Sequence, residues 1–286
     1  MHVLCMLLAL LAGSACGQTA PPPGKGATES ADVGAARDAR PLDVVALANE
    51  GFLLRSGEQA VLIDAFLSVP YAGYDALPAE VLARLEGAET PFEGIDLALV
   101  SHEHADHVQA EPARRFLAAS PDTLLATSPQ ALAIVVGDDE EGVSNHEAYL
   151  PEPGETIVVE RNGVRVEFLR LSHGRNFASL QNLGHVITVG GQRVLHLGDA
   201  ATEARNFRPY ALPGRELDVA LVPYWYFVER GGRALVEEHL LARHVIACHI
   251  PSRERAEIAS KLATSHPHVI VPSEPLQSWT IEPPGH

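Results

Sequence analysis

Lysine is nearly absent from this chain of 286 residues, which contains only Lys25 and Lys261. Lysine and arginine together number 21 against 37 aspartates and glutamates, which gives a formal net charge of −16. This balance argues against a nucleic-acid-binding surface and against adhesion to anionic lipid headgroups, because both need clustered cations. Cysteine is also scarce, with three in the chain, so a fold held together by many disulfides is excluded.

The apolar run at residues 3–12 is too short to span a bilayer but has the length of a signal-peptide core. Small residues at 13–15 then precede Cys16, a pattern that resembles the lipobox of bacterial lipoproteins. We therefore expect residues 1–15 to be a signal peptide and the chain to be exported to the bacterial periplasm or outer cell envelope. Cys16 would then carry a lipid that tethers the chain to a membrane, which leaves Cys248 without a disulfide partner. A signal cleaved without lipidation, or an uncleaved anchor, is the alternative.

Residues 16–40 contain three consecutive prolines and almost no large apolar side chain, so we expect a flexible linker there. Hydrophobic residues make up 46% of the whole chain and charged residues 20%, which is enough to bury a substantial core. Residues 41–286 are therefore predicted to form one domain.

Short apolar runs separated by turn residues predict strands in two series along this domain. The predicted strands are residues 43–48, 51–55, 60–64, 95–100, 156–160, 163–171, 184–189, 193–197, 217–222, 244–248 and 268–271. Helices are predicted at residues 78–85, 114–119, 129–135, 233–243 and 254–263. The predicted fold class is α/β (α+β): two sheets packed face to face with helices on both outer sides, a four-layer αββα sandwich.

The strongest local signal follows the apolar strand at residues 95–100. His102, His104, Asp106 and His107 place three imidazoles and a carboxylate within six residues. For this composition, such a pattern arises by chance in about one chain in seven hundred. Residues two apart in an extended segment point to the same side, so His102 and His104 can share one metal ion while Asp106 and His107 face a second point nearby. Imidazole and carboxylate ligands favour zinc, with iron or manganese as alternatives.

This motif and its place after a buried strand resemble the metallo-β-lactamase superfamily of hydrolases. The resemblance implies a third histidine for the first ion, an aspartate between the two ions and a last histidine for the second. His173, Asp199 and His249 follow in that order, each at the end of a predicted strand. The implied ligands are His102, His104 and His173 for one divalent ion and Asp106, His107 and His249 for the other, with Asp199 between them. The nearest branch includes ascorbate-phosphate lactonase-like enzymes and the phospholipase D that cleaves N-acylphosphatidylethanolamine.

Several further residues are candidates with an open alternative. Asp64 would hydrogen-bond a ligand histidine, or else simply end its strand in a turn. Tyr224 and Trp225 would form an apolar substrate wall, or else a hydrophobic plug over the core. Arg175 and Asn176 would steer an anionic substrate, or else form an exposed polar turn. His185 and His196 lie inside predicted strands and are expected to be core or supporting groups.

The implied chemistry is metal-assisted hydrolysis, in which two ions share a hydroxide that attacks a carbonyl carbon or a phosphorus. Asp106 would orient this hydroxide and take its proton. The bond could be an ester, phosphodiester, lactone or amide in a small-molecule or lipid substrate. A di-iron oxidoreductase on the same fold is one alternative, although such enzymes typically carry glutamate where this chain has His104. A non-catalytic metal-binding envelope protein is the other. The sequence does not indicate an oligomeric state.

Overall fold

The computed structural model of the chain describes residues 38–137 and 143–285. The predicted signal peptide, Cys16 and nearly all of the predicted linker lie outside the described residues. Within residues 38–137 and 143–285, no helix is both long enough and apolar enough to cross a membrane.

The first sheet has seven strands, and the last strand of the chain pairs with the first. The order is β14 (Ser278–Ile281), β1 (Leu42–Ala46), β2 (Phe52–Ser56), β3 (Gln59–Ile63), β4 (Leu97–Val100), β5 (Leu124–Thr127) and β6 (His146–Ala148). The strands from β14 to β3 pair antiparallel, and those from β3 to β6 pair parallel. A tight turn can connect antiparallel neighbours, whereas each parallel pair needs a longer crossover.

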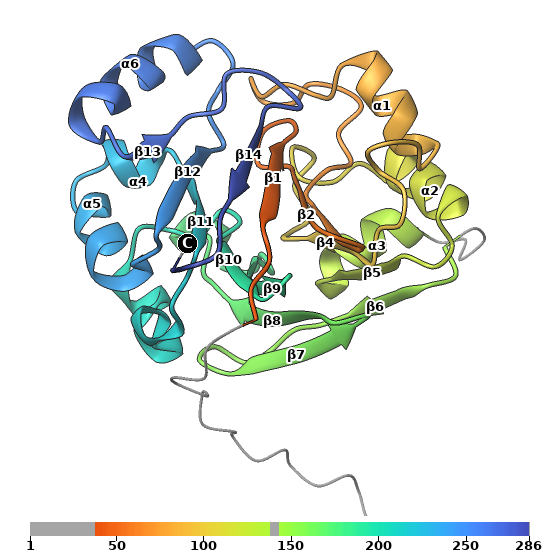
Figure 1. Cartoon of the computed structure of the whole chain (residues 1–286), viewed down its shortest axis with the longest axis horizontal. Coiled ribbons are helices and arrows are strands. Elements are labelled where there is room, and N and C mark those ends of the chain that lie inside the picture. Colours follow the sequence, from red (N-terminus) through yellow and green to blue (C-terminus); the bar gives the residue numbers. More distant parts are fainter. Residues whose placement is uncertain (1–37, 138–142, 286) are drawn as a thin grey trace, which may run out of the picture. The chain divides into compact units, whose positions relative to one another are not determined.

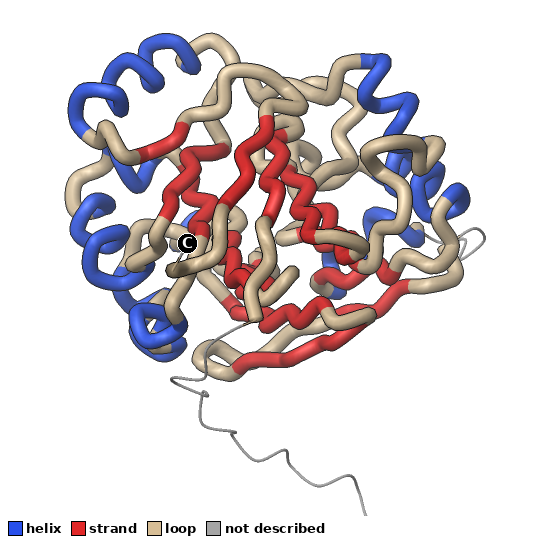
Figure 2. Tube along the Cα trace, in the orientation of Figure 1, coloured by secondary structure: helices blue, strands red, loops and turns tan. Residues whose placement is uncertain are grey.

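The second sheet repeats this arrangement with seven strands from the second half of the chain. The order is β13 (Val269–Ile270), β12 (His244–Cys248), β11 (Val219–Pro223), β10 (Gln192–His196), β9 (Leu183–Val189), β8 (Val164–Arg170) and β7 (Thr156–Arg161). The strands from β7 to β10 are antiparallel, and those from β10 to β13 are parallel. Figure 2 shows the strands of both sheets in the middle, between helices on either side.

Helices cover the outer face of each sheet (Figure 1). The first sheet packs against α1 (Ala79–Glu86), α2 (Ala110–Ala119) and α3 (Pro129–Val136). The second packs against α4 (Trp225–Val228), α5 (Gly232–Leu235), the π-helical segment η5 (Val236–Leu240) and α6 (Arg255–Ser265). Four short 3₁₀ helices complete the connections: η1 (Arg175–Phe177), η2 (Ala204–Asn206), η3 (Arg208–Tyr210) and η4 (Leu212–Arg215).

Three apolar clusters fill the spaces between these layers. One lies between the first sheet and its helices, one between the two sheets, and one between the second sheet and its helices. Strand β4 explains why some strands are continuous apolar runs: Leu97 and Leu99 face the other sheet, while Ala98 and Val100 face the helices. The predicted four-layer αββα sandwich is therefore confirmed.

Some elements differ from the sequence-based expectations. The helix predicted at residues 233–243 is interrupted: α5 passes into the π-helical η5, and Leu241 ends the segment with φ of 40°. Tyr224 and Trp225, predicted as a substrate wall or a hydrophobic plug, lie at the start of the short helix α4 (Trp225–Val228). Strands β5, β6 and β14 were not predicted. Strand β14 alternates exposed and more buried residues at a sheet edge, and so lacks a continuous apolar run.

Candidate metal centre

The segment after β4 brings the predicted motif to one edge of the first sheet. Ser101 fixes the start of this segment, because its backbone N–H and its hydroxyl both donate to the buried Asp64 carboxylate, at 2.7 and 2.6 Å. The two imidazoles that follow converge: His102 Nε2 lies 3.0 Å from His104 Nδ1. His102 is fully buried and His104 is half-buried. The segment therefore points two ring nitrogens at one place.

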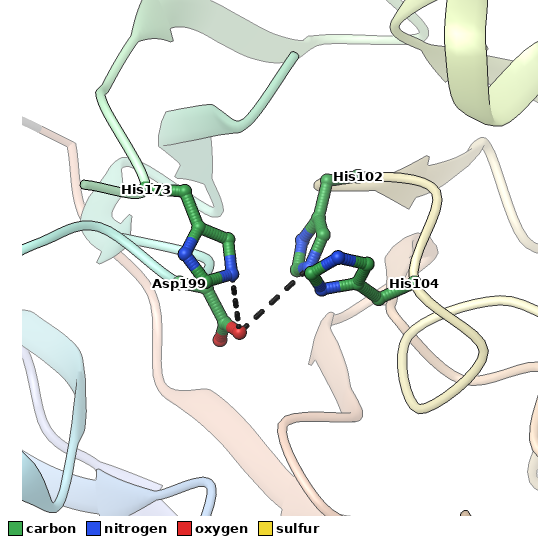
Figure 3. A group of neighbouring side chains, drawn as sticks. All are labelled: His102, His104, His173 and Asp199. Carbon is green, nitrogen blue, oxygen red and sulfur yellow. Dashed lines mark hydrogen bonds and ion pairs between the residues drawn. The ribbon is translucent and has the colours of Figure 1, made fainter. Parts of the chain in front are cut away.

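His173 and Asp199 reach the same place from the second sheet, after β8 and β10 (Figure 3). Asp199 Oδ2 lies 3.0 Å from His173 Nε2 and 3.7 Å from His102 Nε2. One potential ligand atom from each of His102, His104, His173 and Asp199 lies within 4.8 Å of the others. The first predicted ligand set is thus brought together by loops from both sheets.

A second set forms around the other oxygen of Asp199. His107 Nε2 and His249 Nε2 lie 3.1 Å apart, and Asp199 Oδ1 lies 3.4 and 3.1 Å from them. Asp106 Oδ2 is 3.4 Å from His249 Nε2. His249 directly follows β12 and has φ of 56°, a left-handed conformation that is costly for a histidine. Strain of this kind persists where the surroundings hold a side chain in a required direction.

The donor set fits a pair of metal ions. Among the described residues, the buried atoms His173 Nε2 and Asp199 Oδ1 form no hydrogen bond and instead face atoms of other candidate ligands, Asp199 Oδ2 at 3.0 Å and His249 Nε2 at 3.1 Å. The N···N separations of 3.0 and 3.1 Å are close to the roughly 3.3 Å expected between nitrogens bound tetrahedrally to one zinc ion. Imidazole and carboxylate atoms that face one another at ligand spacing without a hydrogen bond are what a metal would satisfy.

Asp64 lies where the sequence analysis expected it, beneath a histidine of the motif. Its Oδ2 accepts a hydrogen bond from His107 Nδ1 at 2.8 Å, which leaves His107 Nε2 facing the site. Burial favours the protonated form of Asp64, but the hydrogen bond and charge of His107, with smaller contributions from His196 and Ser101, together outweigh it and lower the pKa of the carboxyl group. Carboxylate partners of this kind fix the tautomer of a ligand imidazole and raise its basicity.

Burial lowers the pKa of another candidate ligand, His102. Desolvation, and then the nearby His107, hold the pKa of His102 well below 6.5. The imidazole is therefore neutral at physiological pH, and the Nε2 lone pair needs no deprotonation before it can bind a cation. Burial, and then the nearby His173, also lower the pKa of His104.

One buried carboxyl group at the site was missed by the sequence analysis. The strands predicted at residues 43–48 and 51–55 leave Glu50 in the short connection between them, whereas its side chain is fully buried beside His107 and Cys248. One ligand atom of Glu50 lies within 4.8 Å of ligand atoms of His107, Asp199 and His249. The one sequence feature that could have indicated Glu50 is its position. It follows the C-terminal end of β1, and the other candidate ligands also follow the C-terminal ends of their strands.

Three aromatic rings pack against the candidate ligands, and only one of them belongs to a predicted substrate contact. Trp225 packs edge-on against His249, with ring centroids 5.0 Å apart, so the structure brings it to the site. Tyr224 contacts Trp225, and within the described residues its ring meets no candidate ligand. Two rings that were not predicted lie closer to candidate ligands. The ring centroid of Tyr74 is 4.2 Å from that of His249, and the ring centroid of Phe177 is 4.4 Å from that of His173.

The two predicted polar contacts lie at the edge of this ring of aromatics. Arg175 and Asn176 are exposed in η1, directly before Phe177. In the part of the chain that the structure describes, neither side chain forms a hydrogen bond or ion pair, so neither is fixed toward the site. Their role in substrate binding stays a prediction.

His185 and His196 face the core between the sheets, as supporting or core groups. They pair in register on β9 and β10, and their rings stack with centroids 5.7 Å apart. All four of their ring nitrogens are buried without a hydrogen-bond partner among the described residues. Burial, with His196 as the second cause, lowers the pKa of His185 to about 3, and burial is the main cause that lowers the pKa of His196 to about 4.

These lowered pKa values predict how stability depends on pH. In the unfolded chain both histidines titrate near 6.5, so below that pH the unfolded state binds protons that the folded state excludes. Stability should be insensitive to this pair above pH 7 and should fall as the pH drops toward 4. In chelator-treated protein, His185→Leu is expected to reduce the slope of unfolding free energy against pH between 5.5 and 4 by about 1.4 kcal/mol per pH unit.

Urea denaturation at several pH values measures this slope. The matched control is His268→Leu, which removes an exposed imidazole from the connection before β13. An unchanged slope in His185→Leu would show that His185 is protonated in the folded protein.

Comparison with known proteins agrees with this architecture. A family model described as "Beta-lactamase superfamily domain" matches residues 44–237. Among curated proteins, none matches this sequence.

Solved structures with the same fold span nearly the whole described chain. A possible metal-dependent hydrolase from Veillonella parvula is 16% identical with a TM-score of 0.61, over 84% of this chain and 99% of that one. The metallo-beta-lactamase fold protein YhfI from Bacillus subtilis is 17% identical with a TM-score of 0.58, over 84% and 99%. The metallo hydrolase Igni18 from Ignicoccus hospitalis is 17% identical with a TM-score of 0.59, over 85% and 99%.

At these identities the solved structures support the fold alone, while the family match covers more than half of the chain. The two sets of buried and half-buried imidazoles and carboxylates supply a candidate metal site on this fold. The chain therefore belongs to the beta-lactamase superfamily, with the metallo-β-lactamase fold, and is a metal-dependent hydrolase.

Proposed function

We propose that the chain uses two divalent ions to hydrolyse an ester, phosphodiester, lactone or amide bond in a small-molecule or lipid substrate. The observation that carries the proposal is the position of Asp199. Its Oδ2 faces His173 and its Oδ1 faces His249, at 3.0 and 3.1 Å, so one carboxylate joins two separate sets of imidazoles. Zinc suits the first set, which has three histidines and one aspartate.

When bound, a pair of divalent ions polarises the substrate and lowers the pKa of water toward neutrality. Asp106 is the group that would orient the water and accept its proton. Burial alone would favour its protonated form, but the interactions with His249 and His107 together outweigh it and lower the pKa of Asp106, so the group is an acceptor. Asn49 holds this residue in place, because its side-chain amide donates to the Asp106 backbone carbonyl at 2.9 Å.

The substrate class follows from the surroundings of the site. Trp225, Tyr74 and Phe177 surround the candidate ligands with aromatic surface. Such surface favours an acyl, lipid or aromatic group next to the bond that is cleaved. The net charge of −16 argues against nucleic acid as a substrate. Within the superfamily, we propose the branch of the ascorbate-phosphate lactonase-like enzymes and the N-acylphosphatidylethanolamine phospholipase D.

A substrate screen on metal-loaded protein tests this proposal. The panel is bis(4-nitrophenyl) phosphate, simple lactones, a chromogenic cephalosporin and phospholipid vesicles. We expect turnover in at least one class, and its loss when a chelator removes the ions. Protein that carries two ions per chain and hydrolyses nothing in the panel would contradict the proposal.

The metal content itself is the next prediction. Elemental analysis should find two ions per chain in the wild-type protein. In His104→Ala the first set loses one of its three imidazoles, so the content should fall toward one ion and the rate of hydrolysis by at least about 100-fold. His268→Ala, an exposed histidine outside the site, is the matched control. Two ions and full turnover in His104→Ala would show that His104 is not a ligand.

A further inference from the structure

The buried carboxyl group of Glu50 has no role in the predicted ligand sets. Glu50 lies in the turn between β1 and β2, which begins at Asn49 with φ of 52°. The side chain has no exposed surface and enters the site from the core side of His107. A charged group in this position is costly unless it is paired or binds a cation.

The neighbouring donors leave one oxygen of Glu50 without a partner. Cys248 Sγ donates to Oε1 at 3.2 Å. His107 Nδ1 lies 3.6 Å from Oε2, but it is already engaged with Asp64 at 2.8 Å. His196 Nε2 lies 3.8 Å from Oε1, beyond hydrogen-bond distance. Within the described residues, Oε2 is therefore buried and unpartnered.

No arginine or lysine compensates this group in the part of the chain that the structure describes. The basic side chains near Glu50 there are His107 and His196, and His196 is neutral near pH 7 because burial, first of all, lowers its pKa to about 4. The remaining neighbours are ligand atoms: one atom each of Glu50, His107, Asp199 and His249 lie mutually within 4.8 Å. Oxygens on opposite sides of an octahedral ion are themselves about 4.2 Å apart.

We propose that Glu50 binds the second ion directly and makes that position selective for manganese or iron(II) over zinc. This inference rests on the two-ion site of the proposed function. With Glu50, the second position has three carboxylates, from Glu50, Asp106 and Asp199, and the two imidazoles of His107 and His249. A carboxylate-rich set of five ligands suits a harder ion with a higher coordination number, whereas the three-histidine position keeps the preference for zinc. The chain would then hold a mixed pair of metals.

The substitution Glu50→Gln tests the inference, because it keeps the shape of the side chain and removes the anionic ligand. Glu58→Gln, exposed in the turn between β2 and β3, is the matched control. Each protein is stripped of metal, equilibrated with equal concentrations of Mn²⁺ and Zn²⁺, dialysed and analysed for both elements. Wild type and Glu58→Gln should retain about one of each ion per chain. In Glu50→Gln the Mn²⁺:Zn²⁺ ratio should fall at least about tenfold.

Cobalt substitution provides a readout that does not depend on turnover. Visible absorption of Co²⁺ is weak at high coordination number and strong in a tetrahedral site. Removing Glu50 as a ligand should therefore strengthen the absorption of the second Co²⁺ ion bound. Identical cobalt spectra and identical metal ratios in wild type and Glu50→Gln would overturn the assignment of Glu50 as a ligand. Because neither measurement involves a substrate, failure of the proposed hydrolysis would be seen separately in the substrate screen.

Discussion

Asp199→Ala is expected to remove both ions and the hydrolytic activity together, with kcat/KM falling at least about 1,000-fold. Loss of any other single candidate ligand should weaken mainly one position. Asp199 differs because its Oδ2 lies 3.0 Å from His173 Nε2 while its Oδ1 lies 3.1 Å from His249 Nε2. One truncation therefore removes a ligand from each of the two sets.

The electrostatics of the site also depend on this carboxylate. Burial would favour its protonated form, but the neighbouring His249 and His107 outweigh it and hold the pKa of Asp199 well below its usual range. Asp199 is thus anionic before any metal arrives, and it is the negative charge shared by the two sets of imidazoles. Without it, two cations close together would have less charge to offset their mutual repulsion.

Elemental analysis, thermal denaturation with and without chelator, and the substrate screen measure this outcome. In wild type a chelator should lower the melting temperature, because bound ions stabilise only the folded state. In Asp199→Ala it should have no further effect. Asp43→Ala, an exposed aspartate on β1, controls for the loss of a carboxylate elsewhere. Retention of two ions by Asp199→Ala would contradict the bridging role.

The first half of the site could be predicted from local spacing. His102, His104, Asp106 and His107 follow one buried strand, so their neighbourhood in space follows from their neighbourhood in sequence. The other candidates, His173, Asp199 and His249, needed the resemblance to a known superfamily. The hydrophobic periodicity of the strands in the second sheet does not indicate that their ends lie next to those of the first sheet. That contact results from the tertiary packing of two apolar faces.

Glu50 shows why the rest could not be predicted. In the sequence it lies between an asparagine and a glycine, which is a typical exposed turn. It is buried because the turn between β1 and β2 lies at the edge where loops of both sheets meet, and Asn49 O accepts a hydrogen bond from His249 N at 3.2 Å. A turn that contacts a loop almost two hundred residues away has no local signature. The contact of Tyr74 with His249 could not be predicted for the same reason, because the two residues are far apart in the sequence.

The aromatic segment after β11 was interpreted only in part. Tyr224 and Trp225 were expected to form a substrate wall or a plug, and in the structure Trp225 lies at the site while the next residue, Tyr226, fills the core. Trp225 reaches the site, whereas Tyr226 is fully buried and donates its hydroxyl to the Ala200 carbonyl at 2.9 Å. Tyr226 thereby fixes the loop that carries Asp199. Helical spacing in α4 turns neighbouring side chains to different sides, and because no helix was predicted there, the sequence could not separate them.

Gly198→Ala is expected to destabilise the fold by about 2–4 kcal/mol and to weaken metal binding at least about tenfold, although no candidate ligand is replaced. Gly198 has φ of 52°, where an L side chain is strained. A Cβ atom there would lie 2.4 Å from Asn182 Oδ1 and 2.8 Å from Ser101 Cβ. Both neighbours are buried parts of the site, so neither can move without cost.

The added methyl group is expected to displace Asn182, and through it Asp199. Asn182 Oδ1 accepts the Asp199 backbone N–H at 3.0 Å, and its amide donates to the Leu197 carbonyl at 3.2 Å, so this side chain holds the turn that aims Asp199. Displacing it should rotate the Asp199 carboxylate out of line with both sets of imidazoles. Gly214→Ala is the matched control, because a Cβ atom there meets nothing within 4 Å. Urea denaturation and metal titration of the two variants measure the effects, and Gly198→Ala protein with wild-type metal affinity would show that the bridging position tolerates a shifted turn.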